Sequence, residues 1–91
     1  MFYLKVLWHH DAPDYPVEMW SELDADRYET RKMERYAKGT WECWNAERPD
    51  ELGIVPVPEL TEIQEQDEFT AVEIDRASFE HEWQRVCLVR P

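Results

Sequence analysis

Two sets of side chains alternate with a period of two residues through most of the first half of this 91-residue chain, and this pattern limits what the chain can fold into. Residues 2–10 alternate two largely apolar sets of side chains, which is typical of a strand that is covered on both faces inside a sheet. The same period recurs in the segments 17–23, 27–37 and 68–74, and residues 40–46 are expected to form the strand that returns from a hairpin. The sequence therefore predicts an antiparallel sheet of four to five strands.

Turn-forming residues separate these segments. Residues 11–16 hold two prolines and two aspartates, which favour a loop. Residues 23–26 are expected to form a turn, and Lys38 and Gly39 lie where a tight hairpin needs a positive φ. A helix over residues 24–37 is the alternative, because Arg, Lys, Glu and Met are good helix formers, but the alternation favours a strand.

Two helices are expected in the second half of the chain. Residues 59–66 follow a proline and have apolar side chains at helical spacing, which predicts one or two turns. Asp75 is placed to cap the start of a final helix. The apolar stripe of that helix consists of Phe79, Trp83, Val86 and Cys87.

A long connection precedes the short helix. Residues 47–58 contain three prolines and a glycine, and we expect Ile54 and Val55 within them to tuck under the sheet. The predicted fold is α+β, with residues 1–91 as a single domain. In it the short helix and the C-terminal helix pack on one face of the sheet.

The composition indicates a folded protein. Hydrophobic residues make up 43%, including five Trp, four Tyr and three Phe, which is more than a disordered acidic tail would carry. The chain has no run of about 18 apolar residues and no basic-then-apolar leader, so we expect a cytoplasmic protein that does not enter a membrane. Cys43 and Cys87 have no C-x-x-C partner, which in a reducing compartment predicts two free thiols.

The charge is strongly unbalanced. The net charge is −11, and between Glu42 and Asp75 eleven acidic residues face a single base, Arg48. Such a field repels nucleic acid and attracts basic surfaces, so no direct nucleic-acid binding is expected. Residues 27–38 form a small basic stretch, for which internal pairing with the acidic loop is expected rather than contact with phosphates.

Residues with catalytic potential are few. His9, His10 and Asp11 are the first place to seek a metal or a general base, but adjacent strand residues point to opposite faces. His81 could join them only from the last helix. We therefore predict no metal, no cofactor and no enzymatic activity. A small enzyme or ligand-binding domain that uses His9, His10 and Asp11 is the alternative.

Tryptophans could anchor a partner. Trp8 and Trp83 are assigned to the core. Trp41 and Trp44 cannot share a face of a regular strand, so at least one of Trp20, Trp41 and Trp44 should be partly exposed. An exposed indole ringed by carboxylates can hold an arginine or lysine of another protein.

Four segments carry a resemblance to a known family. They are Tyr3–Asp11, Ser21–Lys32, Val55–Pro58 and Glu68–Ile74, together with Phe79 and Trp83. Through them the chain resembles, over nearly its full length, an uncharacterised family of small acidic bacterial single-domain proteins, a domain of unknown function. Residues 41–50 depart from it. The resemblance implies no activity and no site residues. By analogy, free-standing acidic domains of this size in bacteria and phages are often antidotes to toxins or blockers of nucleases.

The leading hypothesis is a proteinaceous inhibitor, either a toxin antidote or a nucleic-acid-mimicking blocker of a nuclease or phage-defence complex, such as an anti-CRISPR. Its expected partner is a basic, nucleic-acid-handling protein, and the chain itself is expected to be a monomer or weak dimer. Charge would speed association and an exposed aromatic side chain would prolong it. A structural subunit is a further alternative. The expected contact residues are Glu47, Asp50, Glu51, Glu59, Glu62, Glu65, Asp67, Glu68, Trp41 and Trp44.

Overall fold

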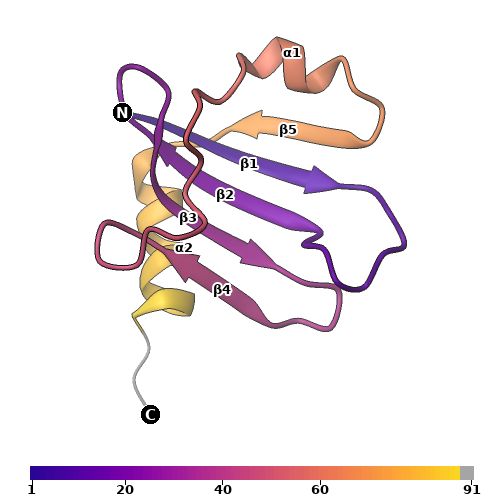
Figure 1. Ribbon diagram of the computed structural model, residues 1–91, viewed down its shortest axis with the longest axis horizontal. Coiled ribbons are helices and arrows are strands. Elements are labelled where there is room, and N and C mark those ends of the chain that lie inside the picture. The colour runs from indigo at the N-terminus through magenta and orange to yellow at the C-terminus, as the bar shows by residue number, and fades with distance from the viewer. Residues whose placement is uncertain (89–91) are drawn as a thin grey trace.

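The computed structural model describes residues 1–88 and contains a five-stranded antiparallel sheet with two helices (Figure 1). The elements are β1 (Phe2–Trp8), β2 (Glu18–Leu23), β3 (Glu29–Arg35), β4 (Trp41–Trp44), α1 (Leu60–Gln64), β5 (Phe69–Glu73) and α2 (Arg76–Cys87). The strand order is β4-β3-β2-β1-β5, so β1 is an interior strand, as predicted. The α+β class and the strand count are confirmed. Within residues 1–88 no helix has the length and apolarity needed to cross a membrane.

The segment with two competing predictions, β3, is a strand. Its Met33 lies opposite Trp20 of β2 and Cys43 of β4, so it pairs on both sides. Gly39 has a φ of +95°, and the hairpin to β4 closes with a hydrogen bond from the Tyr36 N–H to the Thr40 oxygen at 2.9 Å. The strand and its turn are confirmed, because pairing with two neighbours outweighs a weak helix propensity.

The C-terminal helix α2 covers one face of the sheet. The Asp75 carboxylate accepts a hydrogen bond from the Ser78 N–H at 2.8 Å, which confirms the predicted cap. Phe79 and Trp83 are buried on the face that α2 turns to the sheet. They form one core cluster with Tyr3, Trp20 and Met33.

The short helix α1 packs against the opposite face, beside the β5 edge. Its Ile63 joins a second core cluster with Leu4, Leu23 and Ala71. Tyr3 and Leu4 are neighbours in β1 and belong to different clusters, so the two helices lie on different faces. The predicted placement of both helices on one face is therefore wrong. Leu4 and Leu23 would stay uncovered if α1 joined α2.

The connection from β4 to α1 crosses the face opposite α2, in front of the strands in Figure 1. Ile54 and Val55 are 91% and 66% exposed, so the expected burial of this pair is wrong. Val57 packs against the second cluster instead, because its N–H donates to the Arg27 oxygen and holds the backbone against the β2–β3 turn.

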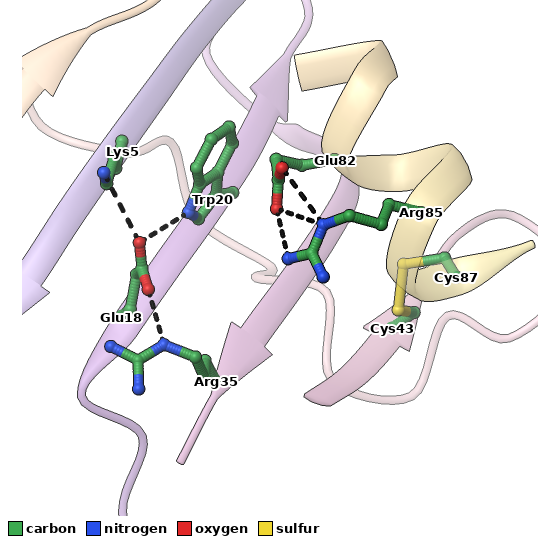
Figure 2. Close-up of polar contacts among 8 residues, drawn as sticks. All are labelled: Lys5, Glu18, Trp20, Arg35, Cys43, Glu82, Arg85 and Cys87. Atoms are coloured by element: carbon green, nitrogen blue, oxygen red, sulfur yellow. Dashed lines mark hydrogen bonds and ion pairs between the residues drawn. A yellow bond between two sulfur atoms is a disulfide. The ribbon is translucent and has the colours of Figure 1, made fainter. Parts of the chain in front are cut away.

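A disulfide joins Cys43 of β4 to Cys87 at the end of α2 (Figure 2). Their Cα atoms are 5.9 Å apart, a normal separation for a disulfide. The prediction of two free thiols is therefore wrong. The fold brings β4 next to the last turn of α2, which the sequence separation of 44 gave no reason to expect.

Candidate functional site

The acidic residues expected to contact a partner lie in two groups at opposite edges of the sheet. The α1 acidic group surrounds α1 beside β5 and consists of Glu59, Glu62, Glu65, Asp67 and Glu68. The β4 acidic group follows β4 and consists of Glu47, Asp50 and Glu51. All eight residues are exposed, and within residues 1–88 only Glu59 has an ion-pair partner, Arg27 at 3.6 Å. The acidic surface expected from the sequence is thus divided into two surfaces.

A buried carboxylate on β2 points toward α2 rather than toward solvent. Glu22 is 7% exposed and receives two hydrogen bonds from Arg31, at 2.9 and 2.6 Å. Further hydrogen bonds come from the hydroxyls of Tyr3 and Thr30. The hydrogen bonds from Arg31 lower the pKa of Glu22 to about 2, and they outweigh burial, which acts in the opposite direction.

Arg31 links this carboxylate to the helix above it. Its guanidinium also binds Glu80 of α2 and lies 5.0 and 5.1 Å from the ring centres of Phe79 and Trp83. The contacts with the two carboxylates raise the pKa of Arg31 above its usual value. The Arg31 guanidinium therefore lies over two aromatic rings and is shared by the two carboxylates.

The contribution of Glu22 to stability is expected to fall by about 3 kcal/mol as the pH is lowered from above 4.5 to about 2, because the folded-state pKa of Glu22 is about 2 and the ordinary value is 4.5. A lowered pKa makes this contribution complete above pH 4.5 and lost as the pH falls through 2. Urea unfolding across this range measures it. The variant Glu22→Gln should show a flatter pH profile, and identical profiles for the two proteins would contradict the assignment.

A second carboxylate of β2 is paired in the same way (Figure 2). Glu18 accepts hydrogen bonds from Arg35 at 2.6 Å and from the Trp20 indole at 3.1 Å, and Lys5 lies 3.5 Å away. Burial raises the pKa of Glu18, but the hydrogen bonds from Arg35 and Trp20 outweigh it, so the pKa lies below its usual value.

The basic stretch is therefore used mainly inside the protein. Arg31 and Arg35 pair with carboxylates of β2 and α2. Within residues 1–88 the predicted pairing with the acidic loop is limited to Arg27 with Glu59 and to Lys32, which donates to the main-chain oxygen of Glu51. Most of the exposed acids in the two acidic groups consequently have no cation of the described residues beside them.

A hollow of about 250 Å³ opens on the face opposite α2, between α1, the connection and the sheet. Apolar side chains from four elements line one part of it, among them Leu4, Met19, Ile63 and Phe69. Three charged side chains of β3 line the other part, namely Glu29, Lys32 and Glu34. An apolar wall with a few polar groups is the usual composition of a ligand site.

Glu34 is a poorly compensated carboxylate in this hollow. Its side chain is 14% exposed, and its ion-pair partner, the Lys32 Nζ, lies 3.8 Å away. That ammonium is also 3.6 Å from the Glu29 carboxylate and donates to the Glu51 oxygen. Burial raises the pKa of Glu34, Lys32 lowers it, and the charges of Glu29, Glu51 and Glu42 raise it further, with a net increase.

The outer wall of the hollow is held by side chains of β3 and of the turn before it. Glu29 accepts a hydrogen bond from the Gly53 N–H at 2.6 Å, and Lys32 binds the Glu51 oxygen. Arg27 donates to the main-chain oxygens of residues 57 and 58 at 2.8 and 2.7 Å. Two of the charged residues in the hollow therefore also position the connection that borders it.

The histidine pair predicted as an alternative site is engaged with the backbone and a hydroxyl. The His10 Nδ1 accepts from the Ala12 N–H at 3.0 Å, and its Nε2 lies 2.8 Å from the Pro16 oxygen, which requires the neutral ring that carries its proton on Nε2. The His9 Nε2 is 2.7 Å from the Thr70 hydroxyl. Both imidazoles thus hold the loop after β1 in place.

The other members of that alternative do not join them. Asp11 is exposed, and His81 lines a separate shallow hollow with Trp20 and Glu82. Among residues 1–88 no group of three or more His, Cys, Asp or Glu side chains could hold a metal ion.

The two tryptophans of β4 lie on opposite faces, as predicted. Trp44 is 5% exposed, lies 5.4 Å from both Lys32 and Arg48, and has an indole N–H with no hydrogen-bond partner in the described part of the chain. Trp41 is half-buried on the α2 side, beneath Arg85. Of the proposed aromatic anchors, only Trp41 is therefore partly exposed; Trp20 is buried as well.

A family model matches residues 2–88, and its description is Domain of unknown function (DUF6881). The chain belongs to the DUF6881 family. The match confirms the resemblance to an uncharacterised single-domain family and runs through residues 41–50, where the sequence was expected to depart. No curated protein matches this DUF6881 chain, and no solved structure matches it.

Sequence reasoning missed the hollow of the DUF6881 domain. Alternation does place Lys32 and Glu34 on one face of β3, and Leu4 on one face of β1. Whether these faces of β1 and β3 lie on the same side of the sheet, and whether α1 covers that side, depends on the strand order and on the position of α1. Neither could be predicted from the alternation. Nothing in the sequence therefore distinguished Glu34 as a carboxylate that lines a hollow.

Proposed function

We propose that this DUF6881 domain is a small acidic binding protein that inhibits a basic, nucleic-acid-handling protein. The observation that carries the proposal is the α1 acidic group, in which Glu59 alone has an ion-pair partner among residues 1–88. Arg31 and Arg35 of the basic stretch are held by Glu22, Glu80 and Glu18 on the α2 face, away from this group. The negative charge is therefore presented to solvent beside α1.

The protein would inhibit its partner by occupying the site where the partner binds nucleic acid. Exposed carboxylates attract the lysines and arginines that a nuclease or a defence complex uses to hold phosphates, and a protein bound there excludes the nucleic acid. The same mechanism would serve a toxin antidote, a nucleic-acid mimic or an anti-CRISPR, and these three differ only in the protein that is inhibited. Action in the cytoplasm follows from that class of partner and not from the disulfide, which is uncommon in reducing compartments.

Removing charge from the α1 acidic group is expected to slow association with the partner by at least about tenfold at low salt, because long-range attraction sets the encounter rate. The partner is first captured from cells with the immobilised protein and identified, and stopped-flow mixing then gives the rate at several salt concentrations. The test variant carries Glu62→Gln, Glu65→Gln, Asp67→Asn and Glu68→Gln.

A control variant with the same change in net charge separates the local patch from the total charge. It carries Asp11→Asn, Asp14→Asn, Asp26→Asn and Glu73→Gln, all at exposed positions outside the α1 acidic group. The control should retain most of the wild-type rate. Equal rates for the wild type and the test variant would reject the α1 acidic group as the contact surface.

A further inference from the structure

We infer that the hollow on the α1 face receives a long basic side chain of the partner, with its cationic group at Glu34 and its alkyl stem along Leu4, Met19 and Phe69. The inference rests on the proposed function and names the point on the domain where the partner is gripped. The α1 acidic group would guide the encounter, and the hollow would prolong the complex.

The shape of the hollow suits a side chain with an apolar stem and a charged end. Its volume is about 250 Å³, and its apolar wall extends from β5 across β1 to β2 before it reaches the charged residues of β3. Lysine and arginine bury their methylene stems on apolar surface and keep the charge at a polar group. An aliphatic side chain alone would leave the carboxylate at the far end without a partner.

The hollow carries negative charge that a bound cation would compensate. Glu29 and Glu34 share a single ammonium, that of Lys32, which also binds the Glu51 oxygen. The three side chains therefore carry one uncompensated negative charge. Within residues 1–88 no group donates a hydrogen bond to the Glu34 carboxylate, so its oxygens remain available to a ligand.

An adjoining hollow of about 360 Å³ gives a charged route toward this position. It shares Glu34 and is lined by three further carboxylates, those of Glu42, Asp50 and Glu51, against one base, Arg48. Part of the β4 acidic group thus lies on the way to Glu34. These carboxylates add to the negative potential at the Glu34 end of the hollow, where the cationic group is placed.

Hexylamine and hexan-1-ol test the inference, because they share an alkyl stem and differ in charge. Titration of the ¹⁵N-labelled protein should shift the amide resonances of Ser21, Glu34 and Gln66, and hexylamine should bind at least about fivefold more tightly than the alcohol. In the isosteric variant Glu34→Gln this preference should disappear. Glu73→Gln, at an exposed position on β5 that lines neither hollow, is the matched control and should keep it.

Folding of the variant is checked independently. Because burial raises the pKa of Glu34, a neutral side chain is better tolerated there, and Glu34→Gln should unfold at a temperature no lower than the wild type at neutral pH. Loss of binding in a variant that keeps its melting temperature then reports on the carboxylate itself. Equal preference for hexylamine in wild type and Glu34→Gln would overturn the inference.

A blocked peptide, Gly-Lys-Lys-Lys-Gly, distinguishes a protein ligand from a free amine. At low salt it should bind more tightly than hexylamine, produce the same resonance shifts and lose this advantage as salt is added. Tighter binding of hexylamine than of the peptide would overturn the assignment to a partner's side chain. The variant lacking four charges of the α1 acidic group should still bind hexylamine, so a failure of the hollow and a failure of the proposed function give different results.

Discussion

Replacement of Arg31 by methionine is expected to lower the free energy of unfolding at neutral pH by about 3 to 5 kcal/mol. Methionine retains an unbranched apolar stem, but it removes the guanidinium that lies over Phe79 and Trp83 and leaves Glu22 buried without its cation. A loss of this size is a large part of the stability of a small domain, which is typically about 5 to 15 kcal/mol. Urea unfolding followed by tryptophan fluorescence measures it.

Two further variants identify the cause of that loss. Glu22→Gln added to Arg31→Met should recover part of the stability, because it removes the unpaired buried charge. Arg85→Met is the matched control, since Arg85 pairs with Glu82 at an exposed position (Figure 2). Its guanidinium also lies over the Trp41 ring. It should unfold at nearly the wild-type urea concentration. A similar loss for Arg31→Met and Arg85→Met would show that enclosure of the Glu22 pair is unimportant.

Reduction of the Cys43–Cys87 disulfide is expected to destabilise the domain by about 4 kcal/mol, the loop-closure value for a separation of 44 residues. The cross-link restricts the unfolded chain, and its removal lets that chain expand. Unfolding curves with and without reductant give the difference. Intact mass before and after reduction should differ by two hydrogens.

The double variant Cys43→Ala with Cys87→Ala is the control for the disulfide. It should resemble the reduced wild type and should not respond to reductant. If reductant leaves both the mass and the unfolding midpoint of the wild type unchanged, the two cysteines are not joined in solution.

Much of the fold could be predicted because it depends on local pattern. The alternation in β1, the glycine after β3, the Asp75 cap and the stripe of Phe79 and Trp83 each act over a few residues, and each is present in the structure. β3 is the informative case. Its residues favour a helix individually, and only the period of two indicated the strand.

The errors concern contacts between segments that are far apart in the chain. In β2, Glu18 and Glu22 alternate with apolar residues, a pattern typical of a solvent-facing side. In the structure that side faces α2, where Arg31 and Arg35 pair with the two carboxylates. The disulfide and the position of α1 were missed for the same reason. The hollow needs Leu4, Glu34 and Ile63 together, and no spacing in the sequence links these residues.

The path of the covalent chain has a mechanical consequence. Cys87 ends α2 and is bonded to β4, while α2 itself follows β5, so the segment between Cys43 and Cys87 forms a closed ring that joins both edges of the sheet. Strands β1, β2 and β3 lie outside that ring. Tension applied to the two ends of the oxidised molecule would peel these three strands away and leave the ring slack, because the sulfur–sulfur bond carries the force past it.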